Sequence, residues 1–156
     1  MTDHLIEIIF KDISVDKIGS LLRTLSFNGR KIVNFNITCD CHEIDWSIEA
    51  SIEKPFLENN NFGLFVKLKE LTFKKTYLSN CGIAIYKDET SINLEINFQL
   101  SDLKKVPIKD LAKNLMELAK SIATQYQIDN YFCGLEPAQE MKTRLFTNEH
   151  LGPFFI

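Results

Sequence analysis

The segment His42-Glu-Ile-Asp-Trp-Ser-Ile-Glu-Ala-Ser-Ile-Glu53 alternates apolar and polar residues along its whole length. Successive side chains of a β-strand point to opposite faces, so this pattern separates two sets of residues. One face would carry Ile44, Trp46, Ile48, Ala50 and Ile52, and the other Glu43, Asp45, Ser47, Glu49, Ser51 and Glu53. The pattern predicts a strand that buries Trp46 in the core and exposes a row of carboxylates.

The residues on either side of this segment predict its neighbours. Alternation of apolar and polar residues predicts a preceding strand over Val33–Cys39. The connection Asp40–Glu43 has the length of a hairpin loop, so the two strands are expected to pair antiparallel. Lys54-Pro55 would end the second strand, because proline cannot donate a hydrogen bond to a ladder.

The N-terminal residues predict a strand followed by a helix. Leu5–Phe10 is rich in β-branched and aromatic residues, which favour strands. Apolar residues at helical spacing predict a helix over residues 15–26, with Ser14 as its N-cap. Asn28-Gly29 would terminate this region, since both residue types tolerate the left-handed conformation found after helices.

The middle of the chain predicts a series of antiparallel strands. Residues 64–73 are predicted as a strand with a bulge near Glu70, where the alternation changes parity. The other predicted elements of this region are turns at Ser79–Gly82 and Lys87–Thr90 and strands at Ile83–Tyr86 and Ile92–Leu100.

An apolar stripe after Pro107 predicts a long helix over Ile108–Tyr126. Tyr131–Cys133 predicts a short strand, and residues 134–156 show little periodicity. Few helices connect the predicted strands, which argues against a parallel doubly wound sheet. We therefore predict an α+β fold, in which an antiparallel sheet of about five to seven strands carries two helices on one face. Residues 1–156 are expected to form a single domain.

Length and charge restrict the class of protein. The chain has 156 residues, and its 18 Lys and Arg against 21 Asp and Glu give a formal net charge of −3. This mildly acidic balance argues against a nucleic-acid partner, which requires a basic face. No signal peptide and no apolar run long enough to span a membrane is visible in the sequence. We expect a cytoplasmic protein with no membrane partner.

Sequence motifs for phosphate binding, nucleophilic catalysis and zinc-dependent hydrolysis are absent. Cys39-Asp-Cys-His42 resembles a ligand cluster, and Cys81 or Cys133 could supply a fourth zinc ligand. Structural zinc sites, however, use cysteine pairs with two to four intervening residues and a second such pair. We therefore expect free, buried or half-buried thiols, with no metal, no cofactor and no catalytic residue.

Residues 39–53 contain five carboxylates and no Lys or Arg: Asp40, Glu43, Asp45, Glu49 and Glu53. They are interpreted in one way as the solvated outer face of a sheet. A second interpretation is a partner-binding surface, because a patch of one charge sign steers and binds an oppositely charged protein. A third is acid–base catalysis by a carboxylate pair, which would require a pocket and shifted pKa values. We predict partner binding at these five residues.

The C-terminal segment Tyr131-Phe-Cys-Gly-Leu-Glu-Pro-Ala138 is followed by Thr143, Phe146 and Gly152-Pro153. Pro137 restricts Glu136 to an extended conformation, and Gly134 permits a sharp bend. The Gly-Leu-Glu-Pro-Ala stretch, at the end of a small acidic α+β domain, resembles the C-terminal part of bacterial immunity proteins. Those proteins are the cognate inhibitors of polymorphic or contact-dependent toxins.

The resemblance implies a cytoplasmic protein without catalysis that binds a toxin domain and blocks its active site or substrate entry. We expect that domain to be basic. The predicted row of carboxylates would then mimic the phosphates bound by a nuclease toxin. An alternative is a small enzyme or ligand-binding domain, with a pocket between the sheet and the helix Ile108–Tyr126. A third is a structural subunit that docks through an exposed Phe154-Phe155-Ile156 tail. We predict the immunity protein.

Overall fold

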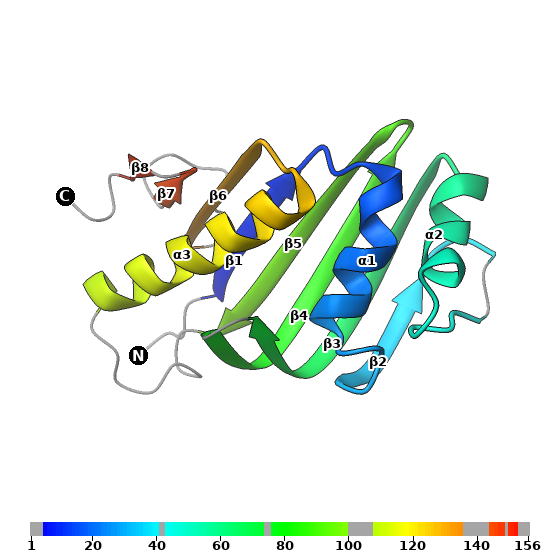
Figure 1. The fold of residues 1–156 in the computed structure, drawn as a ribbon, viewed down its shortest axis with the longest axis horizontal. Coiled ribbons are helices and arrows are strands. Elements are labelled where there is room, and N and C mark those ends of the chain that lie inside the picture. Colours follow the sequence, from blue (N-terminus) through cyan, green and yellow to red (C-terminus); the bar gives the residue numbers. More distant parts are fainter. Residues whose placement is uncertain are drawn as a thin grey trace.

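The computed structural model describes residues 5–40, 43–73, 76–99, 108–135, 144–148 and 150–152. Within these ranges the chain forms three helices and eight strands, and the strands make one antiparallel sheet (Figure 1). The helices are α1 (Val15–Leu25), α2 (Glu49–Glu58) and α3 (Ile108–Tyr126). The strands are β1 (Leu5–Lys11), β2 (Ile32–Ile37), β3 (Asn61–Phe73), β4 (Thr76–Asp88), β5 (Ser91–Gln99), β6 (Asn130–Leu135), β7 (Arg144–Thr147) and β8 (His150–Leu151).

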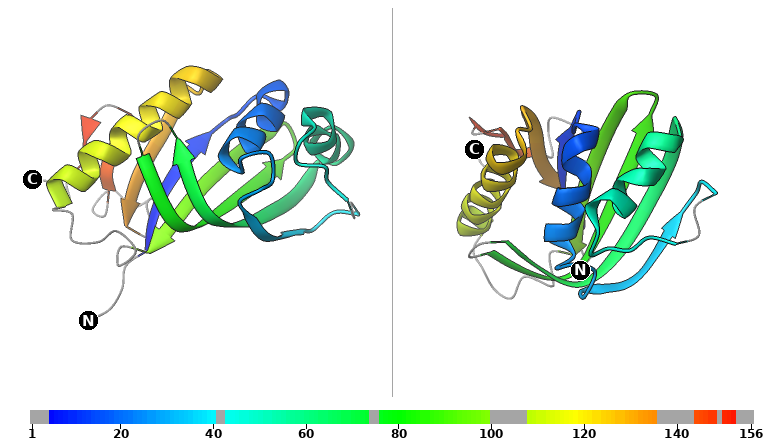
Figure 2. Two further views of the ribbon diagram at one scale, coloured as in Figure 1. Left: turned by 60° about the horizontal axis from the view of Figure 1, so that its bottom comes forward. Right: turned by 45° about the vertical axis from the view of Figure 1, so that its right-hand side comes forward.

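The sheet has the strand order β2-β3-β4-β5-β1-β6-β7-β8, so β1 lies between β5 and β6 near its centre. All three helices lie on one face of the sheet, and the described part of the chain places no helix on the other (Figures 1 and 2). This confirms the predicted α+β class and its one-sided layering. The sheet has eight strands rather than five to seven, and three helices rather than two cover it.

Regular periodicity located several elements correctly. The bounds of α3 are those predicted, while β1 extends one residue further and α1 ends one residue earlier than expected. The apolar stripe of α1 is buried at Ile18, Leu21, Leu22 and Leu25. Burial of one face, repeated over several turns, is the signal that sequence periodicity detects best.

The predicted strand over residues 42–53 is wrong, because residues 43–48 form a loop and α2 begins at Glu49. The Asp45 N–H donates to Ser51 Oγ at 2.7 Å. The Asp45 carboxylate accepts from the Ser47 N–H at 3.0 Å and from its hydroxyl at 2.6 Å. Local bonds of this kind to Asp and Ser compete with a strand ladder and favour the start of a helix.

The burial pattern gives a second reason for the helix. Ile52 and Phe56, one helical turn apart, are both fully buried. Ile48, which the strand would have placed in the core, is 51% exposed. Pro55 lies inside α2 instead of ending a strand. The apolar alternation of residues 44–52 is therefore a local coincidence, and the contacts of Ile52 and Phe56 decide the structure.

The predicted hairpin between residues 33–39 and this segment is also wrong. β2 pairs antiparallel with β3, with Phe35 opposite Val66. Trp46 is nevertheless buried, as predicted, with 8% of its surface exposed. It enters the core from the loop, where its ring meets that of Phe35 edge-on at 5.3 Å between centroids. The loop and α2 are thus held by packing and not by strand pairing.

A lysine from the sheet closes the end of α2. Lys87 Nζ donates to the backbone carbonyls of Phe56 and Asn59, the latter at 2.7 Å. The last carbonyls of a helix have no partner within the helix and carry partial negative charge. A cation from β4 therefore fixes this end of α2 to the neighbouring strand pair.

β3 and β4 form a long hairpin, and the turn predicted at Ser79–Gly82 is wrong because these residues continue β4. Asn80 adopts a positive φ of 52°, which asparagine tolerates better than most residues. Burial in β3 changes parity after Leu68, and the pairing skips Lys69 and Asn80 before resuming in the same register. The bulge predicted near Glu70 is wrong, because the register does not shift: the pairing is interrupted in both strands, and beyond this point the hairpin curves toward the helices (Figure 2).

β7 and β8 lie in residues 134–156, where the sequence predicted no regular structure. β7 pairs with β6, and Phe146, which faces Cys133 in that pairing, is fully buried. The Gly152 backbone lies against the Arg144 carbonyl, where a Cβ atom would not fit. Strands of two to four residues are too short to show a period. Glu136, Pro137 and the apolar end at 154–156 lie outside the described residues.

The core fills the space between the sheet and the helices. Phe10 and Phe98 are among its fully buried side chains. The Tyr126 hydroxyl of α3 donates to Thr24 Oγ1 of α1 at 2.8 Å, which joins two of the covering helices. None of the described helices is both long and apolar enough to cross a membrane.

Candidate functional site

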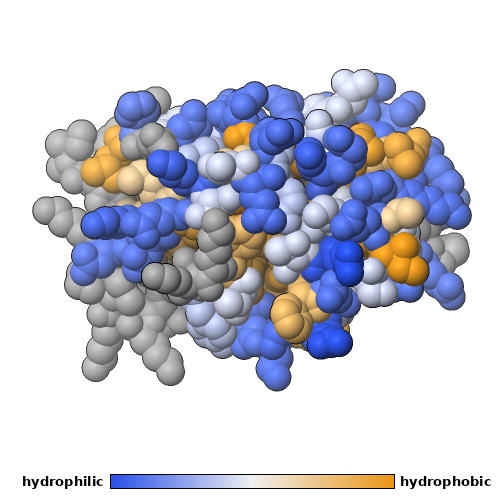
Figure 3. Space-filling model, in the orientation of Figure 1, coloured by the Kyte–Doolittle hydropathy of each residue, from blue (hydrophilic) through white to orange (hydrophobic). Residues whose placement is uncertain are grey.

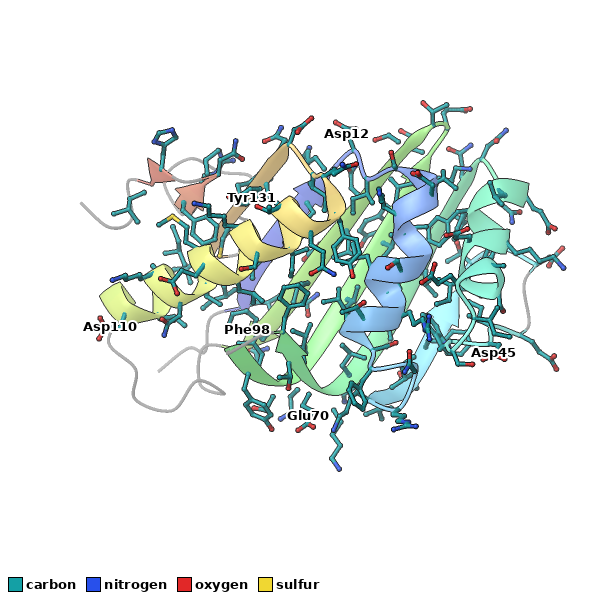
Figure 4. All side chains as sticks on the ribbon, in the orientation of Figure 1. Asp12, Asp45, Glu70, Phe98, Asp110 and Tyr131 are labelled. Carbon is teal, nitrogen blue, oxygen red and sulfur yellow. The ribbon has the colours of Figure 1, made fainter. Side chains whose placement is uncertain are left out.

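The five predicted partner-binding carboxylates do not form a row on a strand. Asp40 and Glu43 lie on either side of residues 41–42, Asp45 lies in the loop before α2 (Figure 4), and Glu49 and Glu53 lie one turn apart on the helix. All are exposed except Glu53, which is half-buried. These five residues are called the acidic segment below.

Asp45 and Glu49 of the acidic segment interact with neighbouring residues. The hydrogen bonds from the side chain and then the backbone of Ser47 lower the pKa of Asp45. Glu49 Oε1 lies 3.5 Å from Arg23 Nη1 of α1. Both side chains of this pair are more than 40% exposed, so solvent screens it and its contribution to stability is small.

Glu53 lies in the contact between α2 and α1. A Cβ atom added to Gly19 would come within 2.7 Å of Glu53 Oε1, so the carboxylate rests against the α1 backbone. Burial, and then the charges of Glu49 and Asp16, raise the pKa of Glu53. This is the shifted carboxylate that acid–base catalysis would need, but the pocket described below has no residue of the acidic segment in its lining.

Two of the cysteines, Cys81 and Cys133, are too far apart to share a metal ion. Cys41 and His42 lie outside the described residues, and Cys39 is half-buried. Cys81 of β4 and Cys133 of β6 are buried in strands three positions apart in the sheet, which separates them by about 14 Å. The described residues contain no group of three or more metal ligands. Burial raises the pKa of the Cys133 thiol, so it is protonated and unreactive.

A pocket of about 520 Å³ lies at the C-terminal end of α3, against β6 and the β7–β8 hairpin. Lys120 and Gln127 from the helix region, Tyr131 from β6, and Asn148 and His150 from the hairpin line it. Figure 4 shows Tyr131 beside α3, on the other side of α1 from Asp45. The pocket lies at the C-terminal end of the helix Ile108–Tyr126, beside which the alternative of a ligand-binding domain placed its pocket.

The helix-free face of the sheet carries residues that the sequence analysis did not single out. Glu7 of β1 is only 8% exposed, while Phe65 of β3 and Tyr86 of β4 are 38% and 47% exposed. The two aromatic rings meet edge-on at 5.6 Å between centroids. The available signal was Glu7 itself, a single carboxylate in the otherwise apolar run Leu5–Phe10.

Comparison with known proteins identifies the family. A family model described as the PABL017 Cdi1I immunity protein matches residues 4–151. The chain belongs to this immunity protein family. A chain in the crystal structure of the toxic C-terminal tip of CdiA from Pseudomonas aeruginosa in complex with immune protein shares its fold, with a TM-score of 0.80 and 22% identity. The alignment covers 97% of the present chain and 99% of the other. Curated proteins provide no match.

The family assignment confirms the resemblance inferred from the C-terminal segment, but the matched region is nearly the whole immunity protein. The residues of that segment within the described ranges have structural roles. Gly134 lies in β6 opposite Glu7, and Phe146 is a core residue of β7.

The two faces of the immunity protein differ in what they offer a partner. On the helix-covered side, hydrophobic side chains form separate patches on a mostly hydrophilic surface (Figure 3). On the helix-free face, the Phe65–Tyr86 pair exposes aromatic surface from two adjacent strands, β3 and β4. An exposed, contiguous aromatic pair is the kind of feature that protein interfaces use as an anchor.

Proposed function

We propose that this immunity protein binds a cognate toxin domain in the cytoplasm and neutralises it by occluding its active site or substrate entry. The observation that carries the proposal is the family match over residues 4–151. The similar structure, described as a toxic CdiA tip in complex with immune protein, supports a toxin domain as the partner. Inhibition by binding requires a stable interface and no reaction on the part of the inhibitor.

The chemistry of the described side chains supports an inhibitor without catalysis of its own. The Cys133 thiol is buried with a raised pKa, which removes it as a nucleophile. The one carboxylate with a raised pKa, Glu53, rests on the α1 backbone outside the pocket lining. No metal or cofactor is part of the proposal.

The acidic segment has a proposed role in association. Asp40, Glu43, Asp45 and Glu49 are exposed around α2, in a chain with a formal net charge of −3. Exposed charges of one sign raise the rate at which an oppositely charged partner meets the protein, and contribute less to the lifetime of the complex. We therefore assign these carboxylates, with Glu53, to the steering of a basic toxin domain.

The test uses the toxin domain encoded next to this gene. The purified proteins should form a stoichiometric complex on gel filtration, and co-expression should protect cells from the toxin. In a purified assay, inhibition should saturate at one equivalent of immunity protein, with no turnover of the toxin into a modified form. Absence of both a complex and protection would reject the proposal, and a sub-stoichiometric, time-dependent inactivation would reject the non-catalytic mechanism.

Ligand binding is a second candidate, favoured by the pocket at the end of α3. Lys120 and His150 place two basic groups, and Asn148 and Gln127 two amides, around the same space. If this pocket serves a small ligand and not the toxin, the Lys120→Ala/His150→Ala variant should protect cells as well as the wild type. Loss of protection in that variant, with an unchanged melting temperature, would place the pocket in the toxin interface.

A further inference from the structure

The helix-free face is built from residues that the strand register brings into rows. One row crosses six strands through Asn36, Phe65, Ala84, Glu95, Ile9 and Phe132. The adjacent row runs through Asn34, Lys67, Gly82, Asn97, Glu7 and Gly134. Residues of the opposite parity, such as Ile8, Ile85 and Leu94, belong to the core beneath the helices. Both rows therefore lie on the side that no described helix covers.

Glu7 is the exceptional residue of this face. Its side chain is buried to more than nine-tenths, yet the described residues provide no hydrogen bond or ion pair to its carboxylate. Buried acidic groups are normally paired. The Glu7 oxygens are not among the fully buried polar atoms without a partner in the described part of the chain, so they stay within reach of solvent. Glu7 therefore has an unused capacity to accept hydrogen bonds from a cation.

The nearest polar neighbour across the sheet is directed elsewhere. Asn97 of β5 lies opposite both Glu7 of β1 and Gly82 of β4. A Cβ atom on Gly82 would be 2.5 Å from Asn97 Oδ1 and 3.3 Å from its Nδ2. The Asn97 amide thus occupies the space over Gly82, on the side away from Glu7. The absence of a side chain at Gly82 keeps this arrangement in place.

An aromatic anchor lies beside these polar groups. In the first row, Phe65 lies next to Ala84, which lies next to Glu95. The Phe65 ring contacts that of Tyr86. A Cβ atom on Gly63 would come within 3.0 Å of the Phe65 ring, so the glycine allows the ring to lie across β3. Partly exposed Tyr and Phe side chains lose little entropy on binding and are frequent interface anchors.

Two carboxylates act on this anchor, and Lys67 borders it on β3. Burial and then the charges of Glu95 and Glu7 raise the pKa of the Tyr86 hydroxyl, so both carboxylates act at the aromatic pair. The cations toward the other edge are engaged, since Arg144 and Lys11 lie 4.4 and 6.0 Å from the Phe132 ring centroid. An incoming Lys or Arg would find carboxylates and exposed aromatic faces together.

We propose that the helix-free face, centred on Glu7, Glu95 and the Phe65–Tyr86 pair, is the surface that anchors the toxin, through a basic segment of that domain. The inference rests on the proposed function. A Lys or Arg side chain of the toxin inserts between the aromatic pair and the carboxylates and pairs with Glu7. The flanking asparagines and Gly82 form the polar border of the contact. The acidic segment around α2 steers the toxin, and this face holds it.

The test measures binding of the toxin domain by surface plasmon resonance or calorimetry. Tyr86→Ala and Glu95→Lys should each raise Kd by about 30-fold or more, mainly through faster dissociation, as expected for the centre of an interface. Glu7→Gln keeps the shape of the side chain but removes its charge. It should raise Kd by about 10-fold without lowering the melting temperature of the free protein.

Matched variants provide the controls. Glu117→Lys makes the same charge change at an exposed position of α3, and Tyr77→Ala removes an exposed tyrosine at the far end of β4. Both should bind as the wild type does. Wild-type binding by the Tyr86, Glu95 and Glu7 variants would overturn this assignment and leave the proposed function intact. A melting temperature lowered by Glu7→Gln would also overturn it, since it would give Glu7 a structural role. Failure of the wild type to bind would instead reject the proposed function.

Discussion

The acidic segment and the helix-free face both carry carboxylates, but in different environments. In the acidic segment, Asp45 bonds to Ser47 and Glu49 faces Arg23, so the charges are exposed and matched by local donors. On the helix-free face, Glu7 is buried to 92% without a described donor. The first arrangement leaves the charges to solvent and local donors, whereas the second leaves a largely buried carboxylate able to accept hydrogen bonds from an incoming cation.

The difference shows that a high density of acidic residues in the sequence is a poor guide to where a partner binds. Residues 39–53 attract attention because five carboxylates lie close together in the chain. In the structure, Asp45 forms hydrogen bonds just before α2 begins, and Glu49 and Glu53 contact α1 from α2. One glutamate in an apolar strand is less conspicuous in sequence but has more unused binding capacity. The predictions below test this contrast.

The largest expected effect is on the free energy of unfolding, when the packing of α2 against the core is weakened. Phe56→Ala removes a fully buried ring that packs against Phe62 at 4.9 Å between centroids. The free energy of unfolding, measured by urea denaturation, should fall by about 3–5 kcal/mol. Leu57→Ala, at the neighbouring position with 69% exposure, should change it by less than about 0.5 kcal/mol. Equal effects at both positions would contradict the helical orientation of residues 49–58.

Substitution of two glycines tests how tightly the two regions are packed: Gly29 lies against Trp46 of the loop before α2, and Gly82 lies on the helix-free face. Gly29 has a φ of +83°, and a Cβ atom there would lie 2.6 Å from the Cβ atom of Trp46. Gly29→Ala should therefore cost about 2 kcal/mol of unfolding free energy, from backbone strain and displacement of the indole. Gly82→Ala should cost less than about 1 kcal/mol, because the Asn97 amide can rotate away. A reversed order would mean that the helix-free face is the more rigid region.

Charge reversal in the acidic segment should affect association alone. The Asp45→Lys/Glu49→Lys variant is expected to slow association with a basic toxin by about 10-fold at low salt and to weaken its salt dependence. Its dissociation rate should stay near that of the wild type, in contrast to the Tyr86 and Glu95 variants. The neutral variant Asp45→Asn/Glu49→Gln is the control for loop structure. It removes the two negative charges without adding positive ones, so it should lose less of the electrostatic steering than the charge-reversed variant. Faster dissociation of the charge-reversed complex would place the acidic segment inside the contact.

The smallest effect is the pH dependence of Glu53. Its pKa is raised above the ordinary value of 4.5, so its contribution to stability is present below that value and is lost as the pH rises through the folded-state pKa. Glu53→Gln should therefore match the wild type near pH 4 and be more stable by a few tenths of a kcal/mol at pH 7. A variant that is less stable at pH 7 would show that Glu53 is paired in the folded protein.

Long elements with a regular pattern were predictable from the sequence. The bounds of α3, and those of β1, β5 and α1 to within one residue, followed from periodic burial of their apolar residues. The immunity protein family was inferred from residues 131–153 and is confirmed over residues 4–151. The partner-binding role of Asp40, Glu43, Asp45, Glu49 and Glu53 stays a prediction. Their spatial arrangement was predicted wrongly, because it depended on the strand over residues 42–53.

Tertiary contacts decided the remainder. Residues 43–53 satisfy a strand pattern locally, but β2 finds its partner in β3, and Ile52 and Phe56 bury one face of a helix instead. Ser79–Gly82 has turn-forming composition, yet β3 and β5 hold it as the middle of β4. The spacing of apolar residues in the sequence shows which face of a helix or strand is apolar. It does not show which other element covers that face. The exposed aromatic pair and the position of Glu7 both follow from that choice of neighbours, which places Glu7 between Asn97 of β5 and Gly134 of β6.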